Sequence, residues 1–464
     1  MQITIVPSKI AFHESKIVDC CVGLTPLTAF SKMEKTGVAI VGMGTVGAGV
    51  ARLLYDHGDR IGRHAGRQLW LTHAVVRDLN KPRDVNLPTD LVTDDVQKVI
   101  DDDSVTVVAQ LIGGIEPAKT IMLKLLEAGK DVVTANKALM AQHGPELFDR
   151  ARELGRVIAF EASVAGGIPI IANISQCLSA NQIVSLQGIL TGTSNYIITR
   201  MDLEGASYAE AVKEAQELGY AEADPSMDVD GTDAVQNLAI LSHLAFGARP
   251  DWTKIPKRGI DKLDESDLRY ARQLGYRVKL IAYSKLVDNK LQLMVGPMLI
   301  KIGTPLAEVR ANYNAVSAIG DAVGPVFFHG QGAGQMPTAS AVVADMIDVA
   351  VGRAKITFET LELWAEGQTR VDVGDPGDLE GRFYLRFDVE DEPNVLAQLA
   401  GVLGKHNISI ASVYQHDSDL TNSGSVPLVI VTKESAEKNA SLAVAEIEKL
   451  DCVAQVAERL RILD

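Results

Sequence analysis

The chain has 464 residues, of which 47% are hydrophobic and 23% charged, a length that suits about three globular domains. Its formal net charge of -15 argues against nucleic acid or an anionic membrane surface as a partner, because both repel a negative protein. The four cysteines lack metal-ligand spacing, and no apolar run reaches the roughly 18 residues of a membrane-spanning helix. These features predict a protein of the cytoplasm with reduced thiols.

The first 32 residues match no targeting signal. They lack the basic stretch and apolar stretch of a secretory signal peptide, and they contain Glu14 and Asp19 but no arginine, unlike a transit peptide. We therefore expect residues 1–32 to be a disordered extension or the product of an upstream start codon, with the functional chain beginning near Met33.

Strands and helices alternate from Gly37 onward. The apolar runs predict strands at 38–41, 70–76, 106–112 and 131–134, and helices at 46–55, 95–101 and 121–128. Strands separated by helices form a parallel, doubly wound sheet. The sequence thus predicts an α/β domain of the Rossmann type over residues 33–162.

A second region, residues 163–352, mixes helices with long strands. Helices are predicted at 208–218, 235–245 and 266–274, and strands at 278–284, 291–297 and 315–322. This order predicts an α+β domain. An alanine-rich helix at 338–351 is expected to pack back on the first domain.

The remainder is predicted to be a linker, residues 353–379, followed by a small domain, residues 380–464. The linker prediction rests on the Gly- and Asp-rich stretch at 367–381. Strands are predicted at 383–389, 408–414, 427–432 and 453–462, and helices at 394–405 and 434–449. This βαββαβ order is typical of a ferredoxin-like fold.

A glycine motif, GMGTVG at 42–47, joins the first predicted strand to the first predicted helix. In a dinucleotide-binding turn, one glycine makes the tight turn, one lets the pyrophosphate approach and one allows close packing of helix on strand. The helix N-terminus then favours the phosphates. The predicted cofactor-binding residues are Gly42, Met43, Gly44, Thr45, Val46, Gly47, Arg77, Gly113 and Lys137.

The end of the second predicted strand bears on the choice of cofactor. An acid there binds the ribose 2′-hydroxyl of NAD, whereas an arginine accepts the 2′-phosphate of NADP. Both are present, as Arg77 and Asp78, and Lys81 and Arg83 follow. The sequence favours NADP and leaves NAD open.

Two further features carry candidate chemistry. Lys137 follows the fourth predicted strand, and ligands of open α/β sheets bind beyond the carboxyl ends of the strands. The stretch from Gly219 to Asp233 holds five carboxylates within twelve residues, which suits an ammonium group and proton transfer.

Six motifs resemble those of homoserine dehydrogenases, over about residues 34 to 351. They are the glycine turn, IGGIEP at 112–117, TANKAL at 134–139, FEASVAGGIP at 160–169, GTSNY at 192–196 and GYAEADP at 219–225. The last domain looks like an ACT domain, a small ligand-sensing module.

This resemblance implies that L-homoserine and L-aspartate 4-semialdehyde are interconverted with NAD(P)H, as a step toward threonine, methionine and isoleucine. It implies catalytic roles for Lys137 and Asp233, the latter also helping to hold the substrate, and binding of the homoserine amino group by Glu222. The other implied substrate-binding residues are Gly192, Thr193 and Asn195, in a substrate-side loop, and Tyr220.

The resemblance further implies a sodium ion, a homo-oligomer and an amino-acid effector. The sodium would lie at the backbone around Glu161, Val164, Gly166 and Ile168. A homodimer or larger assembly would form through the second domain, and threonine would act at the ACT domain.

Two positions depart from the family pattern. Asn237 stands one helical turn after Asp233, where the family has a lysine that donates a proton, and asparagine does not titrate. Asn394 replaces a glycine in the ACT turn. Two alternatives therefore stay open: a non-catalytic amino-acid sensor, and a Rossmann oxidoreductase that acts on another small substrate.

Overall fold

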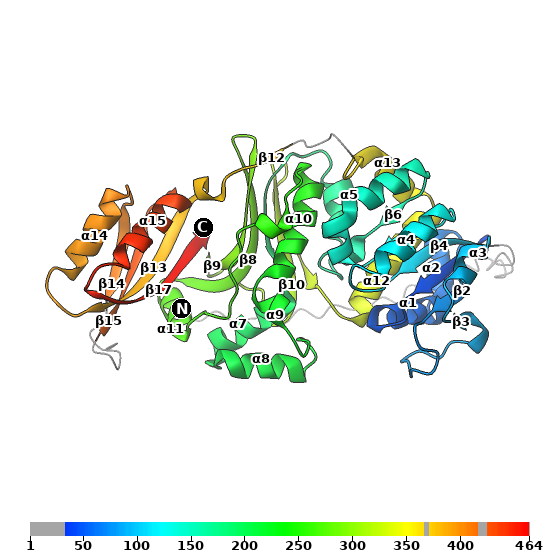
Figure 1. The fold of residues 1–464 in the computed structure, drawn as a ribbon, viewed down its shortest axis with the longest axis horizontal. Coiled ribbons are helices and arrows are strands. Elements are labelled where there is room, and N and C mark those ends of the chain that lie inside the picture. The colour runs from blue at the N-terminus through cyan, green and yellow to red at the C-terminus, as the bar shows by residue number, and fades with distance from the viewer. Residues whose placement is uncertain (1–32, 366–370, 416–424, 464) are drawn as a thin grey trace, which may run out of the picture.

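The computed structural model describes residues 33–365, 371–415 and 425–463, which form an elongated molecule with the C-terminal unit at one end (Figure 1). The predicted disordered extension, residues 1–32, lies outside these residues. Within them, no helix is both long and apolar enough to cross a membrane.

The first domain is a parallel sheet in the order β3-β2-β1-β4-β5-β6, which confirms the predicted Rossmann-type fold. Val38–Val41 are fully buried because helices cover both faces of the sheet. Its strands are β1 (Lys35–Val41), β2 (Gln68–Val75), β3 (Val92–Thr93), β4 (Val105–Gln110), β5 (Asp131–Thr134) and β6 (Ile158–Ala159). Its helices are α1 (Thr45–Asp56), α2 (Gly58–Ala65), α3 (Gln97–Asp101), α4 (Ala118–Glu127) and α5 (Lys137–Glu153).

The second domain is an antiparallel sheet with helices packed on it, which confirms the predicted α+β class. Its strands are β7 (Ile183–Ile189), β8 (Tyr276–Val287), β9 (Lys290–Lys301), β10 (Tyr313–Gly320) and β11 (Gly324–Gln331). Its helices are α6 (Ile170–Ala172), α7 (Gly192–Glu204), α8 (Tyr208–Glu217), α9 (Ser226–Val229), α10 (Thr232–Phe246) and α11 (Glu265–Gln273).

Helix α12 (Gln335–Ala350) returns from the second domain to the first. It packs so closely on α1 that a Cβ added at Gly49 would lie 2.9 Å from the Ala339 Cβ. The two domains are therefore held together by a helix that belongs, in sequence, to the second.

The C-terminal unit has the predicted βαββαβ order. It consists of β13 (Glu380–Glu390), α14 (Val395–Lys405), β14 (Ile410–Gln415), β15 (Ser425–Thr432), α15 (Glu437–Ile447) and β17 (Val453–Leu463), with the short β16 (Ser435–Ala436) before α15. Its sheet is not separate, however. β17 pairs in parallel with β9 from Arg461 to Leu463, so that both sheets form one sheet of 11 strands.

The prediction of a linker at 353–379 is wrong in two places. Residues Arg353–Leu361 form helix α13, whose Phe358 stacks on Phe148 with ring centroids 5.2 Å apart. Asp372–Val373 form β12, which pairs with β9. Helix α13 precedes the Gly- and Asp-rich stretch and is held by apolar burial of Phe358, whereas β12 lies within that stretch and is held by backbone pairing.

Candidate active site

The glycine turn lies between β1 and β4, where the strand order of the first sheet reverses. Gly42 has φ +105°, which favours glycine, and a Cβ at Gly47 would lie 2.1 Å from the Gly42 carbonyl oxygen. Around Gly44, by contrast, the space is open to 4 Å. The three glycines thus match the turning, packing and ligand-approach roles of a dinucleotide-binding turn. Gly113, after β4, also faces open space.

The open space at Gly44 leads to a prediction. Gly44→Ala should change the free energy of unfolding by less than about 1 kcal/mol, because the residue has φ -78° and no neighbour within 4 Å. The KM for the cofactor should rise roughly tenfold or more, about 1.4 kcal/mol, because the methyl group would meet the pyrophosphate. Thermal unfolding and cofactor titration measure the two effects.

Gly47→Ala is the matched control for that experiment. Its added methyl group would collide with the backbone of the free protein, so stability itself should fall. An unchanged cofactor KM in Gly44→Ala would contradict a pyrophosphate at this turn.

Arg77 and Asp78 follow β2 at the same edge of the sheet, and both are exposed. Asp78 accepts a hydrogen bond from Asn80 N at 2.9 Å, and its carbonyl accepts one from Arg83. Arg77 makes no salt bridge within the described ranges 33–365, 371–415 and 425–463. Among the described residues, the guanidinium group of Arg77 is therefore exposed and without an ion-pair partner.

Lys137 opens α5 and is positioned by its neighbour Asn136. The Asn136 side chain accepts a hydrogen bond from Leu139 N at 3.0 Å, which caps the helix, and donates to the carbonyls of Ile112 and Gly114 at 2.9 and 2.6 Å. One asparagine thus ties the lysine to the loop after β4, on the cofactor side.

The Lys137 ammonium group forms an ion pair with Asp233 of α10, the second domain's contribution to the site. The Asp233 side chain is 12% exposed and that of Lys137 33%, so the pair lies at the edge of solvent. The structure therefore brings together the two residues predicted to be catalytic.

Asn237 lies one helical turn beyond Asp233 and is 2% exposed. Its Nδ2 is 3.4 Å from both Asp233 Oδ2 and the Leu190 carbonyl oxygen, which are long hydrogen bonds. Its Oδ1 has no partner among the described residues. The position thus faces the site but offers no titratable group.

Asp228, one of the five carboxylates of the acidic run, is a site residue for which the sequence indicated no separate role. Burial, and next the charge of Asp233, raise the pKa of Asp228 to about 6, although the nearby Thr193 side chain opposes this. Glu222 also raises it, which places Glu222 near the same cluster, and Glu222 is exposed. The signal was available, since Asp228 belongs to the acidic run.

The predicted substrate-side loop, Gly192 to Asn195, is instead the first turn of α7. Thr193 faces the acidic run, where its Oγ1 donates to the Tyr220 carbonyl at 2.7 Å. Asn195 is 1% exposed, donates to the Ala311 carbonyl at 2.9 Å and accepts from Lys279 at 3.0 Å. The helix thus directs Thr193 toward the site and uses Asn195 inside the second domain.

The segment predicted to bind sodium, residues 161–168, lies at the junction of the two domains, where Glu161 contacts Asp345 of α12. Val164 and Gly166 are buried, and their carbonyls accept no hydrogen bond from residues that the structure describes. Nor do three His, Cys, Asp or Glu side chains in those ranges gather at a metal position. Unpaired carbonyl oxygens are hard ligands, so the backbone fits a hard monovalent cation.

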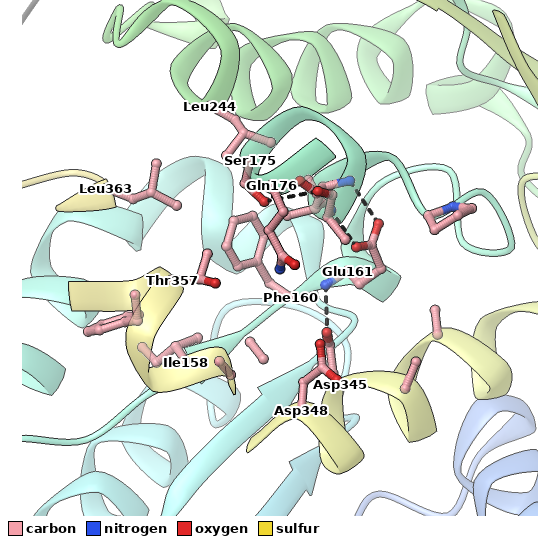
Figure 2. A pocket seen from close by; sticks show the side chains of 18 of the residues that line it. Ile158, Phe160, Glu161, Ser175, Gln176, Leu244, Asp345, Asp348, Thr357 and Leu363 are labelled. Atoms are coloured by element: carbon pink, nitrogen blue, oxygen red, sulfur yellow. Dashed lines mark hydrogen bonds between the residues drawn. The ribbon is translucent and has the colours of Figure 1, made fainter. Parts of the chain in front are cut away.

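Glu161 of this segment lines a cavity of about 280 Å³ beside Asp345 and Asp348 (Figure 2). Its carboxylate accepts hydrogen bonds from Ile171 N and Ala172 N at 2.8 and 2.7 Å, and Glu161 N donates to Asp345 at 2.8 Å. Burial nevertheless raises the pKa of Glu161 to about 7. A nearby cation would offset this cost of burial.

A dinucleotide-binding glycine turn in the first domain, together with a lysine–aspartate pair that joins this domain to the second, indicates an NAD(P)-dependent oxidoreductase. Residues 42–161 match the NAD-binding domain of homoserine dehydrogenase, residues 169–347 match homoserine dehydrogenase, and residues 383–452 match the ACT domain. The chain belongs to the homoserine dehydrogenase family.

Relatives that cover more than nine tenths of the chain support this assignment. The homoserine dehydrogenase of Synechocystis sp. is 40% identical over 434 residues, covering 92% of this chain and 99% of that protein. A homoserine dehydrogenase structure from Thiobacillus denitrificans is 38% identical with a TM-score of 0.84, covering 93% of this chain and 99% of that one. The Staphylococcus aureus enzyme at pH 7.5 is 32% identical with a TM-score of 0.72, covering 93% and 100%.

Proposed function

We propose that the chain interconverts L-homoserine and L-aspartate 4-semialdehyde at the junction of its two catalytic domains. The Lys137–Asp233 ion pair carries this proposal, because it lies between the cofactor-side loop and the acidic run. The nicotinamide cofactor supplies hydride chemistry when it is bound. Lys137 polarises the carbonyl oxygen of the semialdehyde and donates the proton that the resulting alkoxide needs.

The carboxylates divide the remaining work. Asp233 holds Lys137 and the substrate in place, and Glu222 binds the amino group of the substrate at the exposed side of the cluster. Asp228, with its pKa near 6, adds a second negative charge toward that amino group above this pH. Thr193 and Tyr220, which are joined by a hydrogen bond, line the remaining side of the substrate-binding site.

We further propose a preference for NADP over NAD. Arg77 supports this preference, because it is exposed and makes no salt bridge with the described residues. A 2′-phosphate would supply a negatively charged partner for its guanidinium group. A hyperthermophilic archaeal homoserine dehydrogenase, 26% identical with a TM-score of 0.58 and covering 68% of this chain, was solved in complex with NADPH.

Three other parts of the proposal concern binding away from the reaction. The carbonyls of Val164 and Gly166, with those of Glu161 and Ile168, hold sodium at the domain junction. The chain forms a homo-oligomer through the second domain, whose edge strand β11 exposes alternate residues, Phe327 among them at 37%. An amino-acid effector such as threonine binds the ACT domain.

The deciding experiment is a steady-state assay of aspartate semialdehyde reduction with NADPH and NADH, each with and without threonine. Turnover with a higher kcat/KM for NADPH is expected. A folded protein that binds NADPH but gives no turnover would instead favour the amino-acid sensor, and turnover of other aldehydes alone would favour a different substrate.

Asn237 calls for its own test, because it motivates the sensor hypothesis. We expect Asn237→Lys to change kcat by less than about tenfold, since Lys137 already reaches Asp233 and supplies a titratable ammonium group. The assay is kcat against pH for both proteins. A positioned general acid usually contributes roughly 10²–10⁴-fold to kcat. If Asn237→Lys raised kcat a hundredfold or more, the natural chain would therefore be an enzyme that lacks its general acid.

A further inference from the structure

Lys257 and Arg258 lie in an extended segment between α10 and α11, held against β9. Val295 N donates to the Pro256 carbonyl at 2.9 Å, and Arg258 N donates to the Val295 carbonyl at 2.9 Å. Successive side chains of an extended segment point in opposite directions. Lys257 and Arg258 accordingly reach two different parts of the molecule.

Lys257 reaches the start of the catalytic helix α10. Its ammonium group donates to Asp230 Oδ2 at 2.6 Å and also to Thr232 Oγ1. Asp230 in turn accepts a hydrogen bond from Thr232 N at 2.7 Å. Helix α10 has no side-chain hydrogen bond from its own N-cap residue, Gly231, so these contacts fix its first turn. Asp233 is the next residue along.

Arg258 reaches the C-terminal unit. Its Nη1 donates to the Arg459 carbonyl at 2.9 Å, and its Nη2 donates to Glu458 Oε2 at 2.5 Å. The Glu458 side chain is 2% exposed. Glu458 and Arg459 belong to β17, the strand that joins the two sheets. Since a buried carboxylate needs its partner, this contact ties the segment firmly to β17.

We propose that Lys257 is a positioning residue for Asp233, and that the Lys257–Arg258 segment transmits changes in the C-terminal unit to the active site. The inference rests on the proposed role of Asp233. A cavity of about 500 Å³ borders the segment and separates it from Phe383 and Lys438, so the junction leaves the segment room to shift. A displacement of β17 therefore moves Arg258, and with it the first turn of α10.

The first test is steady-state kinetics of the full chain. Lys257→Met should lower kcat/KM about 3- to 10-fold, mainly through the KM for the semialdehyde. The ion pair that it removes is partly exposed, with the side chains of Lys257 and Asp230 38% and 46% exposed, but small displacements of a substrate-holding group are costly. Lys257→Arg should restore most of the loss, since it keeps the charge. A drop in melting temperature without a change in KM would reduce Lys257 to a structural residue and overturn the inference.

A double-mutant cycle tests the link to the C-terminal unit. Glu458→Gln, which keeps the side-chain volume, should lower kcat/KM severalfold in the natural chain and cause no further loss in Lys257→Met. Equal losses in both backgrounds would show that no coupling runs through the segment.

Lys438→Met is the matched control. Lys438 borders the same cavity but pairs with Asp378 at 2.7 Å and does not contact the segment, so kcat/KM should stay unchanged. The two proposals also fail separately. If Asp233→Asn leaves kcat/KM unchanged, the role of Asp233 is wrong, whereas a loss there without a loss in Lys257→Met removes this inference alone.

Discussion

Lys137→Met should lower kcat by roughly 10²–10⁴-fold, the contribution usual for a positioned general acid. The substitution removes the one ammonium group that the structure places beside Asp233 within the described residues. It leaves the Asn136 cap intact, so the fold should persist. Stopped-flow aldehyde reduction measures the loss of kcat, and NADPH binding by fluorescence measures separately any contribution of Lys137 to cofactor binding.

Lys137→Arg separates two functions of Lys137, its positive charge and its donation of a proton. Arginine keeps the positive charge but does not give up a proton at neutral pH, so it should restore substrate binding more than kcat. Lys119→Met removes a lysine of the same domain that pairs with Glu146 at 2.7 Å, and it should leave catalysis unchanged. A Lys137→Met enzyme with near-normal kcat would show that water or another group supplies the proton.

Asp233→Asn should lower kcat/KM by about 10²-fold, since Asp233 positions the group that donates the proton, and a misplacement of about 1 Å costs roughly this much. Asp233 and Lys137 act as one unit, so the double variant should be little worse than Lys137→Met alone. Kinetics of the two single variants and the double variant complete this cycle.

A second measurement is independent of rate. The charge of Asp233 is one of the causes that raise the pKa of Asp228 to about 6, so Asp233→Asn should lower that pKa. The inflection that Asp228 contributes to the pH profile should therefore move to lower pH. Additive losses in the double variant, with no shift of the profile, would contradict a coupled cluster.

The sequence predicted the first domain well because its strands are buried on both faces and read as continuous apolar runs, as at Val38–Val41. Helix α7, whose first residues were expected to form a loop, was not predicted, for the opposite reason. Its first turn buries polar residues, Thr193, Ser194 and Asn195, so it shows no apolar stripe. The pairing of β17 with β9 left no signal either, because backbone hydrogen bonds between distant segments need no particular side chains.

The candidate site divides in the same way. The glycine turn is readable from local geometry, since each glycine meets a separate steric demand. The contact of Lys137 with Asp233 depends on how two domains pack. The periodicity of the sequence contains no information about this packing, and only the resemblance to a family linked the two residues to one site. Asp228 was visible as one more acid in the run, but its raised pKa comes from burial and from a neighbour five residues away.

The continuous sheet gives the C-terminal unit a second importance. β9 is covered by β12 at its start and by β17 at its end, so a chain shortened before residue 371 would present unpaired backbone N–H and C=O groups along this strand. An uncovered strand of this kind is a template for edge-to-edge self-association. The C-terminal unit therefore also protects this strand from pairing with another copy of the chain.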